Sequence, residues 1–316
     1  MAPGGAAPAA KVGSFRGRPA VVLAAGEVRA TFLPTLGMLG ASLRFRGGEY
    51  LALPGGPEAV EQGHPTGLAL LHPWANRLGG DRYRAGRTVV DLSAVPGLSR
   101  DPAGLPIHGT MLAALAWEVE VLAADDLCAR VQARFAYPAD AAQGAAFPFP
   151  HEVGITATVD PSGLSVTTTV RPTGRRAVPV SFGWHPYFRV PGVGRRALLL
   201  HLPDRRHLEL DERLLPTGAT TREGPEAGPL GRRTFDDGYR LGPVATRVLG
   251  LAGGGRSLTV RLDRGYPYAQ VYAPAGRSFV ALEPMTAPTN ALVTGDHPSV
   301  APGDEFSATF SVTFAG

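Results

Sequence analysis

Short runs in which apolar and polar residues alternate dominate this chain, and this pattern constrains its fold more than any other. The clearest run spans residues 305–314, where every second side chain from Phe306 to Phe314 is apolar. Successive side chains of a β-strand point to opposite faces, so such a run turns one apolar face toward a core. No segment shows the periodicity of a helix of three or more turns. The sequence therefore predicts an all-β protein, a large and mostly antiparallel β-sandwich.

Glycine and proline separate these runs. The chain has 41 Gly and 30 Pro, spread along its length and not gathered in one tract. Two hairpins are expected, one joining residues 117–122 to 127–135 and one joining 155–159 to 164–170. The second has an Asp-Pro-Ser-Gly turn, with proline and glycine at the positions that suit type I. No internal repeat of fixed period is found, which weighs against a propeller or solenoid.

Size and composition indicate the class of protein. A chain of 316 residues with 44% hydrophobic content can bury a sizeable core, and β-sandwiches of this length often form one domain. The first ten residues are rich in Ala, Gly and Pro and have neither the charged start nor the apolar stretch of a signal peptide. We therefore expect a disordered tail over residues 1–12, a single domain over residues 13–316 and a cytoplasmic location.

Charge and cysteine content exclude several classes of partner. The net charge is +4, but the basic residues are scattered arginines and form no stripe interleaved with aromatics, which argues against nucleic acid. No apolar run approaches the roughly 18 residues of a membrane span. Cys128 is the only cysteine, so neither an internal disulfide nor a cysteine-rich zinc site is available.

One strand-like run carries a histidine at its end. Residues 178–190 read Val-Pro-Val-Ser-Phe-Gly-Trp-His-Pro-Tyr-Phe-Arg-Val. The apolar side chains before the histidine share one face, and the small Ser181 and Gly183 share the other with His185. Pro186 lacks a backbone donor, so the strand is expected to end near it. Such a histidine is either a general acid or base or a structural residue at a strand end.

A glutamate is presented in the same way about a hundred residues later. Glu283 ends the strand-like run that begins at Phe279 and is followed at once by Pro284, as His185 is by Pro186. Alone, a glutamate at a strand end is usually solvated. One basic and one acidic side chain presented alike have the composition of a general acid/base pair.

Three further segments carry candidate polar side chains. In residues 71–81 and 234–239 they lie beside aromatic residues, and residues 105–109 form a compact His-Gly turn. Each one alone also fits an ordinary surface turn. Loops on a rigid scaffold frequently carry binding residues, and polar groups beside aromatic rings suit a carbohydrate. The candidate substrate-binding residues in these segments are Trp74, Asn76, Arg77, His108 and Asp236.

Other kinds of site lack their motifs. The chain has no phosphate-binding Gly-rich loop ending in Lys-Ser/Thr, no dinucleotide fingerprint, and no Gly-x-Ser-x-Gly nucleophile turn. A metal centre built from His72, His108 and His185 would lack the local His-x-His or His-x₃₋₄-Glu spacing. We therefore expect neither a metal nor a cofactor.

Together these motifs resemble the aldose 1-epimerase (galactose mutarotase-like) family. They follow the family order and span residues 73–291, about two-thirds of the chain. The resemblance implies a large antiparallel β-sandwich that interconverts the α and β anomers of a free sugar, working as a monomer or homodimer with a small-molecule sugar as its partner. The matching stretches are Pro73–Arg77, Ile107–Gly109, Gly183–Phe188, Phe235–Tyr239, and Leu282–Thr286 with Asn290–Ala291.

The resemblance also implies roles for the candidate residues. Glu283 is the general base that takes the proton from the C1 hydroxyl, and His185 is the general acid that protonates the ring oxygen. His108 holds and polarises the ring-oxygen side, while Arg77 and Asp236 fix hydroxyls. This chemistry needs an ionised glutamate and a protonated histidine at rest, and we expect the nearby carboxylate to raise the His185 pKa.

The chain departs from the family pattern in two places. The galactose mutarotases carry Asn-His-x-Tyr-Phe around the acid and Glu-Thr-Gln after the base strand, where this chain has Trp184 and Pro186 and then Pro284-Met285. Galactose is therefore not implied as the substrate. The branch that acts on hexose 6-phosphates usually has His-Gly-Phe-Ala-Arg, whereas His108 is followed by Gly-Thr-Met-Leu. A hexose-6-phosphate 1-epimerase and a non-catalytic carbohydrate-binding or sensing module remain as alternatives.

Overall fold

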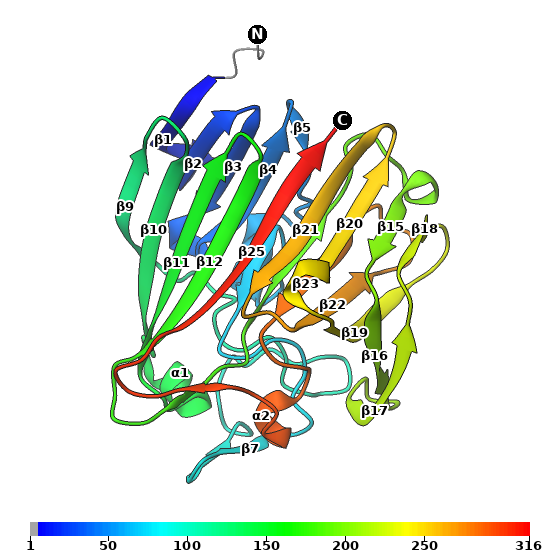
Figure 1. Ribbon diagram of the computed structural model, residues 1–316. Coiled ribbons are helices and arrows are strands. Elements are labelled where there is room, and N and C mark those ends of the chain that lie inside the picture. Colours follow the sequence, from blue (N-terminus) through cyan, green and yellow to red (C-terminus); the bar gives the residue numbers. More distant parts are fainter. Residues whose placement is uncertain (1–5) are drawn as a thin grey trace.

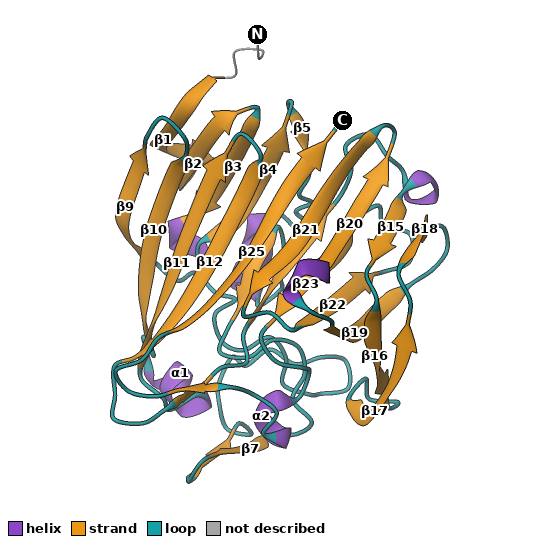
Figure 2. Ribbon diagram, in the orientation of Figure 1, coloured by secondary structure: helices purple, strands orange, loops and turns teal. Residues whose placement is uncertain are grey.

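Two large antiparallel sheets packed face to face form the body of the protein. The computed structural model describes residues 6–316. Within these residues one sheet has 12 strands and the other has nine (Figures 1 and 2). The longest α-helix in this range, α1 (Ala141–Ala146), has six residues. The prediction of an all-β, antiparallel sandwich is confirmed.

The 12-stranded sheet carries most of the candidate site. Its strand order alternates between distant parts of the chain, so β6, β14, β23, β22 and β19 become neighbours in its middle. From edge to edge the order is β1 (Ala6–Phe15), β2 (Arg18–Gly26), β3 (Val28–Leu33), β4 (Leu39–Phe45), β6 (Leu68–Leu71), β14 (Gly183–Phe188), β23 (Val280–Met285), β22 (Tyr268–Ala273), β19 (Phe235–Leu241), β16 (Arg205–Leu210) and β17 (Pro216–Glu223), with β5 (Gly48–Glu49) beside β4.

The nine-stranded sheet covers the inner face of the larger one. Both predicted hairpins lie in it, because β9 pairs with β10 and β11 pairs with β12. Its order is β18 (Glu226–Pro229), β15 (Leu199–Leu202), β20 (Val248–Gly253), β21 (Arg256–Arg264), β25 (Phe306–Ala315), β12 (Gly163–Pro172), β11 (His151–Asp160), β10 (Ala129–Tyr137) and β9 (Glu118–Ala124).

The remaining elements are short. No helix within residues 6–316 has the length and apolar content needed to cross a membrane. Strand β7 (Arg82–Ala85) pairs with β8 (Thr88–Asp91), and β13 (Val178–Pro179) pairs with β24 (Ser299–Val300). The other helices are α2 (Ala291–Thr294) and single 3₁₀ segments at Pro34–Leu36, Pro57–Gln62, Arg195–Ala197 and Val244–Thr246.

Strand β14 has one face in the core and one face on the outside of the sandwich. The fully buried Trp184 ring lies 5.9 Å from the ring of Phe310 in β25, and its Nε1 donates to Thr168 Oγ1 in β12 at 2.9 Å. Burying a ring such as that of Phe310 stabilises the fold by roughly 1.5–3 kcal/mol. Because side chains alternate along a strand, His185 points away from this core, as the sequence predicted.

The register of β14 and β23 places the two candidate catalytic residues opposite each other. Gly183 pairs with Met285 and Tyr187 pairs with Ala281. Counting inward from either pair, His185 stands directly across from Glu283. Facing side chains of adjacent antiparallel strands have Cβ atoms only about 4.5–5.5 Å apart, so the register alone brings an imidazole and a carboxyl into contact.

Neither proline ends its strand, contrary to the sequence prediction. Strand β14 continues through Pro186 to Phe188, and β23 continues through Pro284 to Met285. Each proline lacks a backbone N–H only on the side where β14 faces β23. These two strands pair at Gly183 with Met285 and at Tyr187 with Ala281, and no residues pair in the stretch between these two positions. Each strand stays in the sheet through its other neighbour. The pairs that hold them are Pro186 with Leu68 of β6 and Pro284 with Ala269 of β22.

The predicted disorder of residues 1–12 is wrong for residues 6–12. These residues belong to β1, which pairs with β2 in a register that sets Val12 opposite Val21. The Val12 side chain is 75% exposed, so backbone pairing to β2, and not burial, holds this edge strand. Composition alone does not reveal such pairing. Residues 1–5 lie outside the described residues.

Substituting Gly183 with alanine is expected to destabilise the fold. A Cβ there would contact Met285 Sδ and lie 2.8 Å from the Pro284 carbonyl oxygen, inside the closely packed β14–β23 pair. Overpacking of this kind typically costs about 1–3 kcal/mol. Urea unfolding should show this loss for Gly183→Ala, whereas Gly80→Ala, where a Cβ meets nothing within 4 Å, should match the wild type. Equal stabilities for the two variants would contradict the packing described here.

Candidate active site

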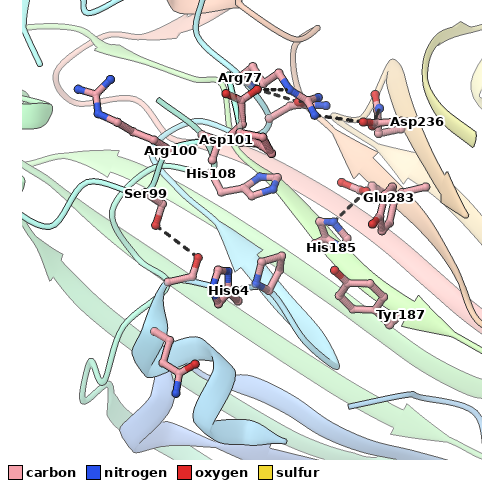
Figure 3. A pocket seen from close by; sticks show the side chains of 18 residues that line it. His64, Arg77, Ser99, Arg100, Asp101, His108, His185, Tyr187, Asp236 and Glu283 are labelled. Atoms are coloured by element: carbon pink, nitrogen blue, oxygen red, sulfur yellow. Dashed lines mark hydrogen bonds and ion pairs between the residues drawn. The ribbon is translucent and has the colours of Figure 1, made fainter. Parts of the chain in front are cut away.

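A pocket of about 640 Å³ lies over the outer face of β14, β23, β22 and β19. Its floor consists of strand residues and its walls of loops that connect early strands (Figure 3). The floor residues are His185, Tyr187, Gln270, Tyr272, Asp236 and Glu283, and the wall residues include His64, Asn76, Arg77, Ser99, Arg100, Asp101 and His108.

The His185–Glu283 pair lies at the centre of the pocket floor. His185 Nε2 is 3.2 Å from Glu283 Oε1, and the two side chains are only 6% and 2% exposed. The Tyr187 ring lies 4.5 Å from the His185 ring and is tilted by 30° to it, and the His108 ring meets the His185 ring edge-on at 5.5 Å. The imidazole is therefore fixed by rings on two sides and by a carboxyl on a third.

Burial sets the protonation of this pair. Desolvation lowers the pKa of His185 to about 3, so the expectation that the carboxylate would raise it is wrong. The Glu283 pKa is raised well above its ordinary value, chiefly by burial and further by the Asp236 carboxylate, with Arg77 acting in the opposite direction. Both shifts favour a neutral imidazole beside a protonated carboxyl. The pair then holds one proton and no net charge.

Arg77 is held between two carboxylates at the pocket wall. Its Nε donates to Asp101 Oδ2 at 2.8 Å, and one of its terminal nitrogens donates to Asp236 Oδ2 at 3.1 Å. Gln270 donates to the other Asp236 oxygen at 2.8 Å. These contacts fix donors and acceptors at defined positions beside the pair, an arrangement suited to binding neighbouring hydroxyl groups.

The loops that supply Arg77 and His108 are joined to each other. The backbones of Arg77 and Ile107 form an isolated antiparallel β-bridge, and the His108 backbone N–H donates to the Asn76 carbonyl oxygen at 3.1 Å. Asn76 and His108 both adopt left-handed backbone conformations, with φ of 59° and 63°. Such conformations cost non-glycine residues free energy, and they persist where the surroundings fix them, as at binding sites.

Six of the seven predicted site residues converge on this pocket, namely His185, Glu283, Arg77, His108, Asp236 and Asn76. Trp74 does not. The Trp74 side chain is fully buried in the hydrophobic core and does not line the pocket. The Trp74 backbone forms an isolated β-bridge with Ser181. The prediction that Trp74 binds substrate is therefore corrected, because the loop turns its ring away from the site that Asn76 faces.

Several lining residues were not predicted from the sequence. Gln270 is the polar exception in the apolar strand β22, and that exception was a usable signal. Tyr187 and Tyr272 looked like ordinary strand aromatics. Asp101 lies in a loop without any recognisable motif and reaches the site only through its contact with Arg77.

Two other histidines are buried away from the pocket lining. His72 Nε2 and His151 Nε2 lie 2.7 Å apart, and His151 Nδ1 lies 2.6 Å from the Phe149 carbonyl oxygen. The Tyr137 ring stacks on His151 at 4.8 Å. Within residues 6–316 no group of three or more His, Cys, Asp or Glu side chains is arranged to hold a metal ion.

The family assignment follows from comparison with known proteins. The profile of the aldose 1-epimerase family matches residues 46–313, and the chain belongs to this family. This membership supports a general epimerase or mutarotase function.

Solved structures show the same fold at low sequence identity. A galactose mutarotase-like protein from Clostridium acetobutylicum has a TM-score of 0.85 at 18% identity, with 98% of this chain and 99% of that chain covered. A galactose 1-epimerase from Lactobacillus acidophilus has a TM-score of 0.76 at 15% identity, with 96% of each chain covered. An aldose epimerase homologue from C. elegans has a TM-score of 0.73 at 17% identity, with 98% and 99% covered.

The buried His151 should make stability depend on pH. In the folded protein burial lowers its pKa from 6.5 to about 4, so the unfolded chain binds a proton that the folded protein does not across this window. His151 by itself therefore lowers the free energy of unfolding as pH drops from 6.5 toward 4, by at most about 1.4 kcal/mol per pH unit. Urea unfolding between pH 7 and 5 should show this fall, and His151→Asn should reduce it. An unchanged slope in the variant would contradict the assignment.

Proposed function

We propose that the chain is an aldose 1-epimerase that interconverts the α and β anomers of a free aldose. The observation that carries the proposal is the contact between His185 and Glu283 at the centre of a pocket lined with hydroxyl-binding groups. Anomer exchange needs one group to accept the proton of the C1 hydroxyl and another to donate a proton to the ring oxygen, both of which are bonded to C1. A cross-strand pair that shares one proton supplies both.

The proposed reaction moves two protons in opposite directions. Glu283, as the carboxylate, takes the proton of the C1 hydroxyl, while His185, as the imidazolium, gives its proton to the ring oxygen. The bond between C1 and the ring oxygen breaks, leaving an aldehyde at C1 and a hydroxyl at the former ring position. Rotation about C1–C2 presents the other face of the carbonyl. Closure on that face reverses both transfers and yields the other anomer.

The resting protonation of the pair fits this cycle. Ring opening leaves Glu283 protonated and His185 neutral, which is the state that burial favours in the empty site. A proton shift along the 3.2 Å contact between Oε1 and Nε2 converts this state into the ion pair that starts the reaction. Both states have the same total charge, so the pocket need not stabilise a new net charge during the cycle.

Three other residues orient the sugar in this scheme. Arg77 and Asp236 present a fixed donor and acceptor for hydroxyl groups, and Arg77 also lowers the Glu283 pKa, which favours the base form. His108 is kept neutral, because burial, His185 and Arg77 all lower its pKa. A neutral imidazole next to the acid binds the ring-oxygen side without competing for its proton.

The pocket favours an unphosphorylated sugar over a hexose 6-phosphate. Its two lining arginines already have carboxylate partners, since Arg77 contacts Asp101 and Asp236, and Arg100 contacts Asp81 at 2.7 Å. Neither offers an unoccupied guanidinium to a phosphate. A purely carbohydrate-binding role would not require the buried acid/base pair, whose desolvation carries a free-energy cost.

Replacing the proposed base should abolish most of the activity. Polarimetry of fresh α-glucose or α-galactose should show faster mutarotation with the wild-type protein, and Glu283→Gln should reduce the rate by roughly 10²–10⁴. The exposed Glu212 provides a matched control, and Glu212→Gln should keep the wild-type rate. Unaltered activity in Glu283→Gln, or no acceleration across a panel of aldoses, would refute the proposal. A clear preference for glucose 6-phosphate would favour the phosphosugar alternative.

Activity should not decline on the acid side of neutrality. The pair works with one proton, and it takes up a second one only as pH falls through the lowered His185 pKa of about 3. It loses its single proton only above the raised Glu283 pKa. We expect kcat/KM to vary little as pH falls from 6.5 to 5, where an exposed histidine would take up a proton. A decline of about tenfold per pH unit already below pH 6.5 would show that the histidine titrates as if exposed.

A further inference from the structure

Three arginines stand side by side across the strands at the end of the 12-stranded sheet. Arg206 of β16 pairs directly with Arg222 of β17 on one side and with Arg240 of β19 on the other. Cross-strand partners share a face, with Cβ atoms only about 4.5–5.5 Å apart. The arginine row, as we name these three residues, therefore concentrates three positive charges. The strands that carry them, β17, β16 and β19, lie side by side at this end of the sheet (Figure 1).

The protein balances only part of the charge of this row. Arg222 forms an ion pair with Asp204 at 3.2 Å. Within residues 6–316, Arg206 and Arg240 form no ion pair with any carboxylate. Like charges directly opposite each other on a sheet are destabilising. The row thus carries a cost that an anion bound between the guanidinium groups would remove.

The arginine row lines a hollow of about 250 Å³. Asp204, Arg205, Leu241 and Gly242 complete its lining. Arg205 is 6% exposed and already contacts Glu223 and Glu226, so its charge is neutralised. The remaining lining charges are three arginines against one aspartate, a net charge of +2. Guanidinium groups bind phosphate and sulfate through paired hydrogen bonds, and the size of the hollow suits a small anion.

We propose that the arginine row is a binding site for a small oxyanion, either inorganic phosphate or sulfate or the phosphate group of a small metabolite. This site is separate from the sugar pocket, and no residue lines both. Arg240 follows Asp236 by four residues on the same face of β19, which corresponds to about 13 Å along the strand. The site therefore lies on the same side of the sheet as the His185–Glu283 pair.

Phosphate-dependent stabilisation tests the site without reference to catalysis. Unfolding is followed in urea with sodium phosphate, and with sodium chloride at matched ionic strength. At a phosphate concentration ten times the dissociation constant, the folded state should gain about elevenfold over the unfolded state. The double variant Arg206→Ala/Arg240→Ala should lose this gain. Without phosphate and at low ionic strength it should be no less stable than the wild type, because the repulsion has been relieved.

A matched control separates a specific site from general charge screening. Arg84 and Arg87 of the β7–β8 hairpin are exposed and form no ion pair within residues 6–316. The variant Arg84→Ala/Arg87→Ala changes the net charge by the same amount and should keep the full phosphate response. Equal responses from the wild type and Arg206→Ala/Arg240→Ala would overturn the proposal. So would loss of the response in the control variant.

Calorimetric titration of the wild type identifies the source of the anion. Inorganic phosphate, sulfate and glucose 6-phosphate are titrated separately. The site is supported if any of the three binds and the double variant Arg206→Gln/Arg240→Gln binds it at least tenfold more weakly. If glucose 6-phosphate binds more tightly than inorganic phosphate, the site is assigned to a phosphorylated metabolite. Binding of heparin but of none of the three small anions would overturn the small-oxyanion proposal, because the row would then serve an extended acidic partner.

Discussion

The contact between His185 and Glu283 follows from the register of two neighbouring strands, and the site depends on that register. Strands β14 and β23 are far apart in the sequence and adjacent in the sheet. Because each also pairs with a further strand, the facing residues are held from both sides. The sandwich core beneath β14 prevents rotation of the strand, since Trp184 anchors its inner face. A rigid sheet thus fixes the distance between the proposed acid and the proposed base, and the loops add the groups that we propose orient a sugar.

Low dielectric surroundings give the pair its proposed chemistry. Burial lowers the His185 pKa and raises the Glu283 pKa, so the pair retains a single proton at every pH between these two pKa values. Arg77, between Asp101 and Asp236, supplies charge close to the carboxyl without being free to move. Strand pairing, burial and this fixed cation act together. We infer that burial makes the neutral pair the resting state and that Arg77, which lowers the Glu283 pKa, reduces the cost of forming the ion pair from which ring opening starts.

Local sequence patterns predicted the sandwich, its hairpins and most of the site, because alternation and short motifs are properties of adjacent residues. Features set by distant parts of the chain were missed. Pro186 was expected to end its strand, but pairing with β6 maintains it. Trp74 lies in an irregular loop, where side-chain direction cannot be read from periodicity. The lowered His185 pKa results from burial by the whole fold. Asp101 joins the site only through a tertiary contact.

Two-dimensional exchange NMR on an equilibrated aldose tests the central claim most directly, because it observes anomer interconversion at equilibrium. The wild-type protein should produce cross-peaks between the H1 signals of the α and β anomers, at a rate far above that of the sugar alone. His185→Asn and Glu283→Gln should each remove these cross-peaks while the fold is kept. Sugar signals that broaden on binding without any exchange cross-peaks would contradict the account, and would instead identify a carbohydrate-binding protein on this fold.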